Sequence, residues 1–297
     1  MNWLFGSKNS EIQSTSSAPP PSPPPVVEEL RQDAALANEF QQAFLGRAYP
    51  VVPAVHVQGR LRLSFAHSYQ PALAVGGDFF NIEAVGPDAA GIFVADVMGH
   101  GTRSALITAI IRTLLNELQP QGRNAPHFMR QINQRFCSML RGLPFTFFAS
   151  ACYVVADTTA RIATYSTAGH PPPFFLHRHL GRVSQLDVPR PNGAALGVLP
   201  EDDYGGGTVR LQDGDGFVFF TDGVFEAMNA AGEEFGMARF EAALKANIYK
   251  TGAELLSAVR EAIAGHVGDA VLHDDVCLVS VDVTTAAATA SPAPHGL

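Results

Sequence analysis

The sequence predicts an α+β fold, because segments with the pattern of strands are grouped together and helical segments lie between the groups. Residues 60–66 alternate polar and apolar side chains, as a half-buried strand does. Residues 91–97 form an apolar run that leads into a glycine-rich turn, which is typical of a buried strand. Over residues 102–118, apolar side chains recur at spacings of three and four and mark one face of a helix. With 297 residues, the chain can bury a sizeable core.

The composition divides the chain into four parts. Residues 1–27 contain a tract rich in serine and proline, which cannot bury a core and predicts a disordered arm. Residues 28–52 read as an amphipathic helical linker, and residues 53–283 have the mixed patterns of a globular domain. Residues 284–297 are rich in alanine, threonine and proline without periodicity, so we expect a disordered tail.

The helix expected at residues 28–45 carries apolar side chains at spacings of three and four, between charged and amide residues. Two roles fit this pattern: the helix packs on the surface of its own domain, or it is a short dimerising or signal-receiving element. About two and a half heptads are too few to predict a coiled coil. The positions that define the pattern are Leu30, Ala34, Ala37, Phe40, Gln41 and Phe44.

Beyond residue 118, strand-like apolar runs dominate, and three further helices are expected. The strands are expected at residues 145–156, 161–167, 173–177, 216–221 and 276–283, and the helices at residues 124–141, 237–248 and 251–266. This grouping favours an α+β fold over a regular parallel alternation of strands and helices.

The charge and the cysteine content exclude several classes of function. The formal net charge is -8 and no run is rich in lysine or arginine, which argues against nucleic acid or an anionic membrane as the main partner. No apolar run approaches the ~18 residues that span a bilayer. The three cysteines lack CxxC spacing, which argues against a disulfide framework and a zinc knuckle. We therefore expect a cytoplasmic protein.

Four acidic positions share one setting, the junction of an apolar run and a turn. They are Asp78, Asp96, Asp222 and the pair Asp274-Asp275. A carboxylate at the rim of a buried sheet is costly to desolvate unless it is paired, and converging carboxylates repel one another without cations. Two divalent ions would neutralise such a group, and oxygen-only ligands suit magnesium or manganese. Isolated turn or capping residues remain the alternative interpretation.

Five segments in order also resemble a known family. They are Val-Gly-Gly-Asp-Phe-Phe-Asn at 75–81, Asp-Val-Met-Gly-His-Gly at 96–101, Thr-Ala-Gly-His-Pro-Pro at 167–172, Thr-Asp-Gly-Val-Phe-Glu-Ala at 221–227 and Asp-Asp-Val-Cys-Leu-Val at 274–279. Together they resemble the SpoIIE/RsbU-type branch of the metal-dependent (PPM) protein serine/threonine phosphatases. The resemblance covers roughly residues 53–283, and five motifs in the right order are far more specific than any one of them.

The resemblance implies a central sandwich of two antiparallel β-sheets flanked by helices, with two manganese or magnesium ions at one end. Asp96 would then bridge both metals, and Asp222 and Asp274 would complete the shell of one of them. Asp78 and the backbone carbonyl of Val97 would serve the other. Asp274 matches the ligand position of the family better than its neighbour Asp275, which is the fallback.

The resemblance further implies hydrolysis of phosphoserine or phosphothreonine by attack of a metal-activated water. The implied substrate is a phosphorylated STAS-type anti-sigma-factor antagonist in a bacterial partner-switching pathway. An upstream activator or a dimer partner would act through the helix at residues 28–45. His100 and His170 are candidate general acids, but a histidine next to glycine is more often a turn residue or a partner of the ligands. The acid for the leaving group therefore stays unassigned.

Two other functions are considered. A catalytically silent phosphatase-like scaffold that binds a signalling partner is the main alternative, although intact Asp78, Asp96, Asp222 and Asp274 argue against it. A diguanylate cyclase is suggested only superficially by residues 76–80, where Phe79 stands in place of an acid.

Overall fold

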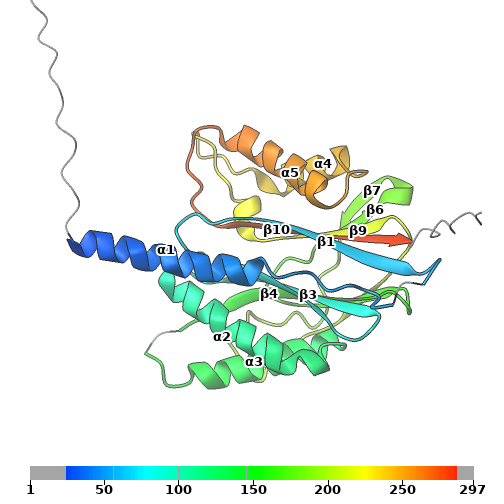
Figure 1. Ribbon diagram of the computed structural model, residues 1–297, viewed down its shortest axis with the longest axis horizontal. Coiled ribbons are helices and arrows are strands. Elements are labelled where there is room, and N and C mark those ends of the chain that lie inside the picture. The colour runs from blue at the N-terminus through cyan, green and yellow to red at the C-terminus, as the bar shows by residue number, and fades with distance from the viewer. Residues whose placement is uncertain (1–24, 56, 100, 145, 286–297) are drawn as a thin grey trace, which may run out of the picture.

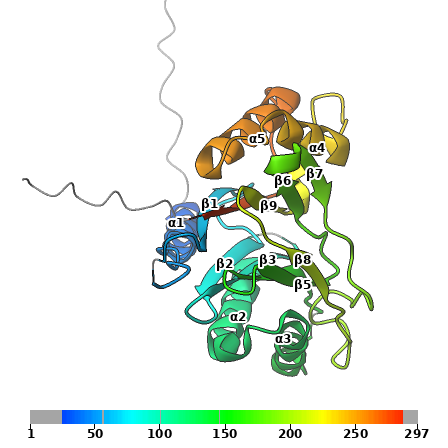
Figure 2. The same cartoon turned by 90° about the vertical axis from the view of Figure 1, so that its right-hand side faces the viewer.

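Two five-stranded antiparallel sheets pack face to face and are covered by helices on both outer sides (Figures 1 and 2). The computed structural model describes residues 25–285 except 56, 100 and 145. Sheet 1 has the order β1 (Leu61–Gln70), β10 (Val276–Thr285), β9 (Asp215–Phe220), β6 (Phe174–His177) and β7 (Arg182–Gln185). Sheet 2 has the order β2 (Asp78–Ala84), β3 (Ala89–Val97), β4 (Ala149–Asp157), β5 (Ile162–Ala168) and β8 (Gly207–Arg210).

The helices form two outer layers and one flank. Helices α4 (Gly236–Ala246) and α5 (Gly252–Val267) cover sheet 1, and α2 (Thr102–Leu118) and α3 (Ala125–Leu140) cover sheet 2 (Figure 2). Helix α1 (Pro25–Leu45) lies along the side where β1 and β2 are the edge strands, in contact with α2 and β2 (Figure 1). Short 3-10 turns occur at Gln119–Gln121, Arg178–Leu180 and Asp222–Val224.

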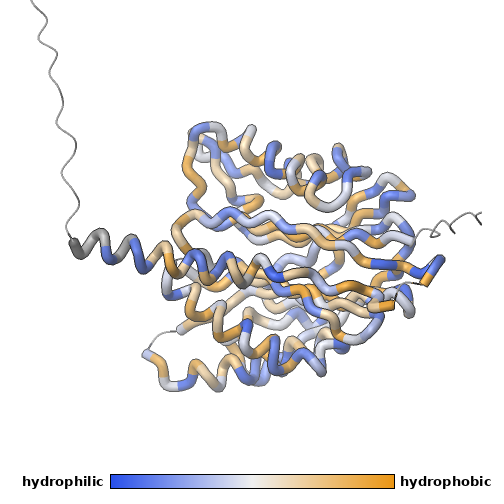
Figure 3. The backbone as a smooth tube through the Cα atoms, in the orientation of Figure 1, coloured by the Kyte–Doolittle hydropathy of each residue, from blue (hydrophilic) through white to orange (hydrophobic). Residues whose placement is uncertain are grey.

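Strand β9 shows why the central strands read as continuous apolar runs. Phe217 and Phe219 belong to the core between the two sheets, whereas Val218 and Phe220 belong to a second core beneath α4 and α5. Successive side chains of a strand point to opposite faces, so a strand that is buried on both faces is apolar at every position. Figure 3 shows such apolar stretches along the strands between the helical layers.

The expected α+β sandwich is confirmed, and the main elements lie close to their expected positions. Helix α2 has the predicted bounds of 102–118, and the other predicted helices and strands are shifted by a few residues. Helix α1 begins at Pro25, and β10 continues to Thr285, two residues into the expected tail. The rest of the predicted arm and tail, residues 1–24 and 286–297, lies outside the described residues.

Three strands escaped prediction. Strands β7 and β8 have four residues each, which is too short for an alternation to be recognised. Strand β2 follows two glycines and is buried at its first five positions, so it shows neither a clear boundary nor an alternation. Asp78 therefore lies at the beginning of a strand, where the sequence pattern predicts none.

None of the helices among the described residues is long and apolar enough to span a membrane.

Candidate metal centre

Asp78 and Asp96 are neighbours because the register of β2 and β3 places them directly opposite each other. Side chains of directly opposed residues project from the same face of a sheet. In the next pair of strands, Ser150 of β4 lies opposite Asp96. At this end of sheet 2, three polar side chains therefore form a row across β2, β3 and β4.

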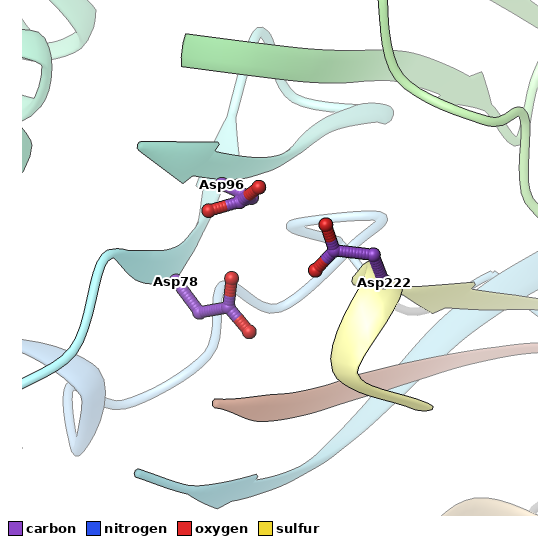
Figure 4. Close-up of side chains that lie close together, drawn as sticks. All are labelled: Asp78, Asp96 and Asp222. Atoms are coloured by element: carbon purple, nitrogen blue, oxygen red, sulfur yellow. The ribbon is translucent and has the colours of Figure 1, made fainter. Parts of the chain in front are cut away.

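Asp222 reaches the same point from the other sheet. It follows β9 and begins the 3-10 turn Asp222–Val224. One carboxylate oxygen from each of Asp78, Asp96 and Asp222 lies within 4.8 Å of the other two, and Figure 4 shows the three side chains close together. Three of the predicted metal-binding residues are thus brought together from positions far apart in the sequence.

The adjacent acids Asp274 and Asp275 have different surroundings. The buried Asp275 accepts hydrogen bonds through Oδ2 from the backbone of Gly77 (2.7 Å) and Asp78 (3.4 Å), and through Oδ1 from Ala72 N (2.8 Å). Its carboxylate holds the loop that leads into β2. Asp274 is exposed, and its Oδ1 accepts a hydrogen bond from the backbone N–H of Asp275 (2.8 Å). The group of three carboxylates does not include Asp274, so its role as a ligand stays a prediction.

Glycines at positions 76 and 77 allow this loop to approach the site. A Cβ on Gly77 would lie 2.4 Å from the carbonyl oxygen of Val97, and a Cβ on Gly76 would lie 1.9 Å from Oδ2 of Asp275. Val97 N also donates a hydrogen bond to Gly77 O (3.3 Å). The carbonyl of Val97 is therefore next to the loop that carries Asp78, and its role as a ligand stays a prediction.

Thr221 connects the sheets and was missed by the sequence analysis. Its Oγ1 donates to Oδ2 of Asp78 (2.5 Å) and accepts from the backbone N–H of Cys277 (3.1 Å). The only signal in the sequence was its place directly before Asp222. Of the two histidines considered, His100 lies outside the described residues, and His170 is buried and hydrogen-bonded.

The surroundings of Asp78, Asp96 and Asp222 disfavour the charged forms of these three carboxylates. Burial, and then the charge of Asp96, raises the pKa of Asp78 well above its ordinary value. Burial, and then the charges of Asp222 and Asp274, raises the pKa of Asp96 to about 7. The pKa of Asp222 is also raised, first by burial and then by Asp274. A cation would offset both causes.

The donor set fits a hard divalent cation. Its side-chain donors are all oxygens, which magnesium and manganese prefer. Among the described residues, Oδ1 of Asp222 is buried and has no hydrogen-bond partner. A cation would satisfy such an atom, so the residues present fit the metal that the sequence predicts.

One family model and several known proteins match this chain. The family model described as Stage II sporulation protein E (SpoIIE) matches residues 86–284. Protein IcfG of Synechocystis sp. is 25% identical over 238 residues, which cover 72% of this chain and 37% of that protein. Phosphoserine phosphatase RsbU of Bacillus subtilis is 23% identical over 252 residues, covering 85% of this chain and 70% of RsbU. This chain thus spans little more than a third of the length of IcfG.

Solved structures share the fold. The SiaA-PP2C domain of Pseudomonas aeruginosa superposes with a TM-score of 0.70 at 23% identity, covering 86% of this chain and 98% of that domain. At this identity the similarity shows the architecture, a two-sheet sandwich of the PP2C type.

Proposed function

The chain belongs to the SpoIIE family of PPM-type protein serine/threonine phosphatases, and we propose that it hydrolyses phosphoserine or phosphothreonine on a signalling protein. The observation that carries this proposal is the convergence of Asp78, Asp96 and Asp222 within 4.8 Å, from two sheets, in that fold. The proposal includes two divalent cations, manganese or magnesium.

Each residue of the site has a distinct part in the proposal. Asp96 lies close to both other acids and would bridge the cations. Asp222 and Asp274 would hold one cation, and Asp78 and the carbonyl of Val97 would hold the other. When bound, two such cations lower the pKa of a shared water and neutralise charge on the phosphoryl oxygens. Thr221 holds the carboxylate of Asp78 in place through its hydrogen bond.

The cysteines support hydrolysis by water over a thiol nucleophile. Cys152 and Cys277 are buried, and burial raises the pKa of both thiols. Burial also raises the pKa of Cys137. Because the thiolate is the nucleophilic form, none of these groups is prepared for attack on a phosphate ester.

We propose a phosphorylated STAS-type antagonist as the substrate. The relative RsbU is named a phosphoserine phosphatase, which supports phosphoserine as the group that is hydrolysed.

Phosphate release from a phosphorylated STAS-type protein tests the proposed function. We expect release with manganese or magnesium and loss of release in excess chelator, because the acidic cluster needs a cation to become catalytic. Restoring the metal should restore the rate. Unchanged release in chelator would refute the proposed mechanism, and metal binding without release from any phosphoprotein would favour the silent scaffold.

We also propose that a signal reaches the site through α1, by way of an activator or a second copy of the chain. Gln41 forms two hydrogen bonds with one residue of the loop before Asp78: its Oε1 accepts from Gly76 N (3.1 Å) and its Nε2 donates to Gly76 O (3.0 Å). Asn38, one turn earlier, donates to Ala74 O. A displacement of α1 would therefore pull on the loop that positions Asp78.

Replacing Gln41 by leucine is expected to weaken manganese binding and phosphate release roughly tenfold, because two hydrogen bonds of about 0.5–1.5 kcal/mol each are lost at the loop. Gln42→Leu is the matched control, since Gln42 is the exposed neighbour on the same helix. Calorimetric titration with manganese and the phosphate assay measure both effects. Equal behaviour of the two variants would contradict the proposed connection.

A further inference from the structure

His170 occupies a position that the proposed chemistry does not use. It follows β5, its exposed fraction is 5%, and both ring nitrogens have partners. Nε2 lies 3.0 Å from the carbonyl oxygen of Phe220, which can only accept, so Nε2 carries the proton. Nδ1 is then the acceptor for the hydroxyl of Ser150 at 2.7 Å. Burial lowers the pKa of His170 to about 4, in agreement with a neutral ring.

The two partners of His170 belong to different sheets. Ser150 lies on β4 directly opposite Asp96, in sheet 2. Phe220 is the last residue of β9 in sheet 1, two positions before Asp222. The imidazole therefore links the neighbour of Asp96 to the segment that carries Asp222. These two acids come from separate sheets. The backbone hydrogen bonds within each sheet therefore do not set the distance between Asp96 and Asp222.

A second link lies on the other side of Asp96. Thr221, between Phe220 and Asp222, donates to Asp78 on β2. In sheet 2, β3 lies between β2 and β4, so Asp96 lies between the strand of Asp78 and the strand of Ser150. Residues 220–222 are thus attached to sheet 2 on both sides of Asp96. Both links are side-chain hydrogen bonds, and loss of either one leaves the turn anchored on one side only.

We propose that His170 is a positioning residue that sets the separation of Asp96 and Asp222 for metal binding. The inference rests on the metal centre of the proposed function. The like charges of these two half-buried acids repel each other, and the link through His170 opposes their separation before any cation binds. Removal of a side chain that positions metal ligands without binding the metal itself typically weakens metal affinity about 10- to 100-fold.

A pair of substitutions separates the two hydrogen bonds of His170. Glutamine can place an amide N–H near the position of Nε2 and keep the bond to Phe220 O, whereas asparagine is too short to reach it. We expect His170→Asn to weaken manganese binding to the full chain about 10- to 100-fold. We expect His170→Gln to weaken manganese binding less, by about three- to tenfold, because the bond to Phe220 O is retained and only the bond from Ser150 is lost.

The role of His170 is tested by two measurements: manganese dissociation constants from calorimetry and thermal unfolding of the metal-free proteins. Equal affinities of both variants and the unchanged protein would overturn the inference, as would equal losses in both. A lower unfolding temperature of His170→Asn with an unchanged dissociation constant would assign His170 to the fold alone and overturn it as well.

Two further results keep the test decisive. If His170→Asn does not fold, Ser150→Ala takes its place, because it leaves the imidazole intact but removes the donor that orients it. We expect it to weaken manganese binding by about three- to tenfold, and an unchanged affinity would count against the inference. If the unchanged protein binds no manganese, the proposed metal centre itself fails, a result distinct from every outcome above.

Discussion

Replacing Asp96 by asparagine is expected to abolish metal-dependent phosphate release, with a loss on the order of a thousandfold or more, since metal catalysis contributes several kcal/mol to the reaction. Asp96 is paired with Asp78 across the two strands and lies close to Asp222, so its substitution removes one of the three converging negative charges. Asparagine has nearly the same shape, so the β2–β3 pairing is expected to persist.

The same substitution is expected to stabilise the metal-free protein at pH 8. In the folded state the pKa of Asp96 is raised to about 7, above its ordinary value of 3.8, so folding disfavours the charged carboxylate. The unfavourable contribution grows as the pH rises from 3.8 to about 7 and is fully present above that. Asparagine removes it. A phosphate assay and thermal unfolding in chelator measure the two effects.

Asp269→Asn is the control for Asp96→Asn, because Asp269 is exposed just beyond α5 and the change in net charge is the same. We expect this control to keep its activity and its unfolding temperature. Activity of Asp96→Asn above about a tenth of the unchanged protein would be incompatible with a bridging role, since removal of such a ligand should cost several kcal/mol.

Replacing Arg178 by methionine is expected to lower the free energy of unfolding by about 3–5 kcal/mol, because it leaves a buried charge without its partner. The guanidinium Nη2 pairs with Oδ1 of Asp282 at 2.5 Å, and the side chains are only 9% and 3% exposed. Oδ2 of the same aspartate accepts from the backbone N–H of Gly252, at the start of α5. The guanidinium also donates to the carbonyl oxygens of Gly214, Asp215, Ile248 and Lys250.

Urea unfolding of the full chain measures this loss, and Arg182→Met is the control. Arg182 is exposed on the neighbouring strand β7, so its loss should change the free energy of unfolding by no more than about 0.5 kcal/mol. The double variant Arg178→Met, Asp282→Asn should be more stable than Arg178→Met alone, because the unpaired charge is gone. A loss below about 1 kcal/mol for Arg178→Met would mean that water replaces the guanidinium, contrary to its burial.

Most of the fold was predictable where the burial of side chains follows a simple pattern along the sequence. Helix α2 was predicted with its correct bounds, because its apolar face has a strict spacing of three and four. Strand β9 was predicted because both faces are buried and six successive residues are excluded from solvent. Strands β7 and β8 were missed because four residues carry no measurable period. The place of β8 also depends on pairing with β5, about 40 residues earlier in the chain.

The candidate site was predictable as a set of residues but not as an arrangement. Asp78, Asp96 and Asp222 were found through their motifs, and the structure brings them together. The difference between Asp274 and Asp275 was not visible, because both are acids at the start of one strand. Only the fold shows that Asp275 binds the backbone of a loop about 200 residues away.

The sequence by itself determined the class of the fold and the identity of the acids, because both are expressed locally, in periodicity and in short motifs. Only the tertiary structure decided how the acids are held. Thr221 and Asp78 are 143 residues apart, His170 and Phe220 are 50 apart, and Gln41 and Gly76 are 35 apart. Contacts of this kind depend on how two sheets and a helix pack against one another, and local sequence patterns do not predict that packing.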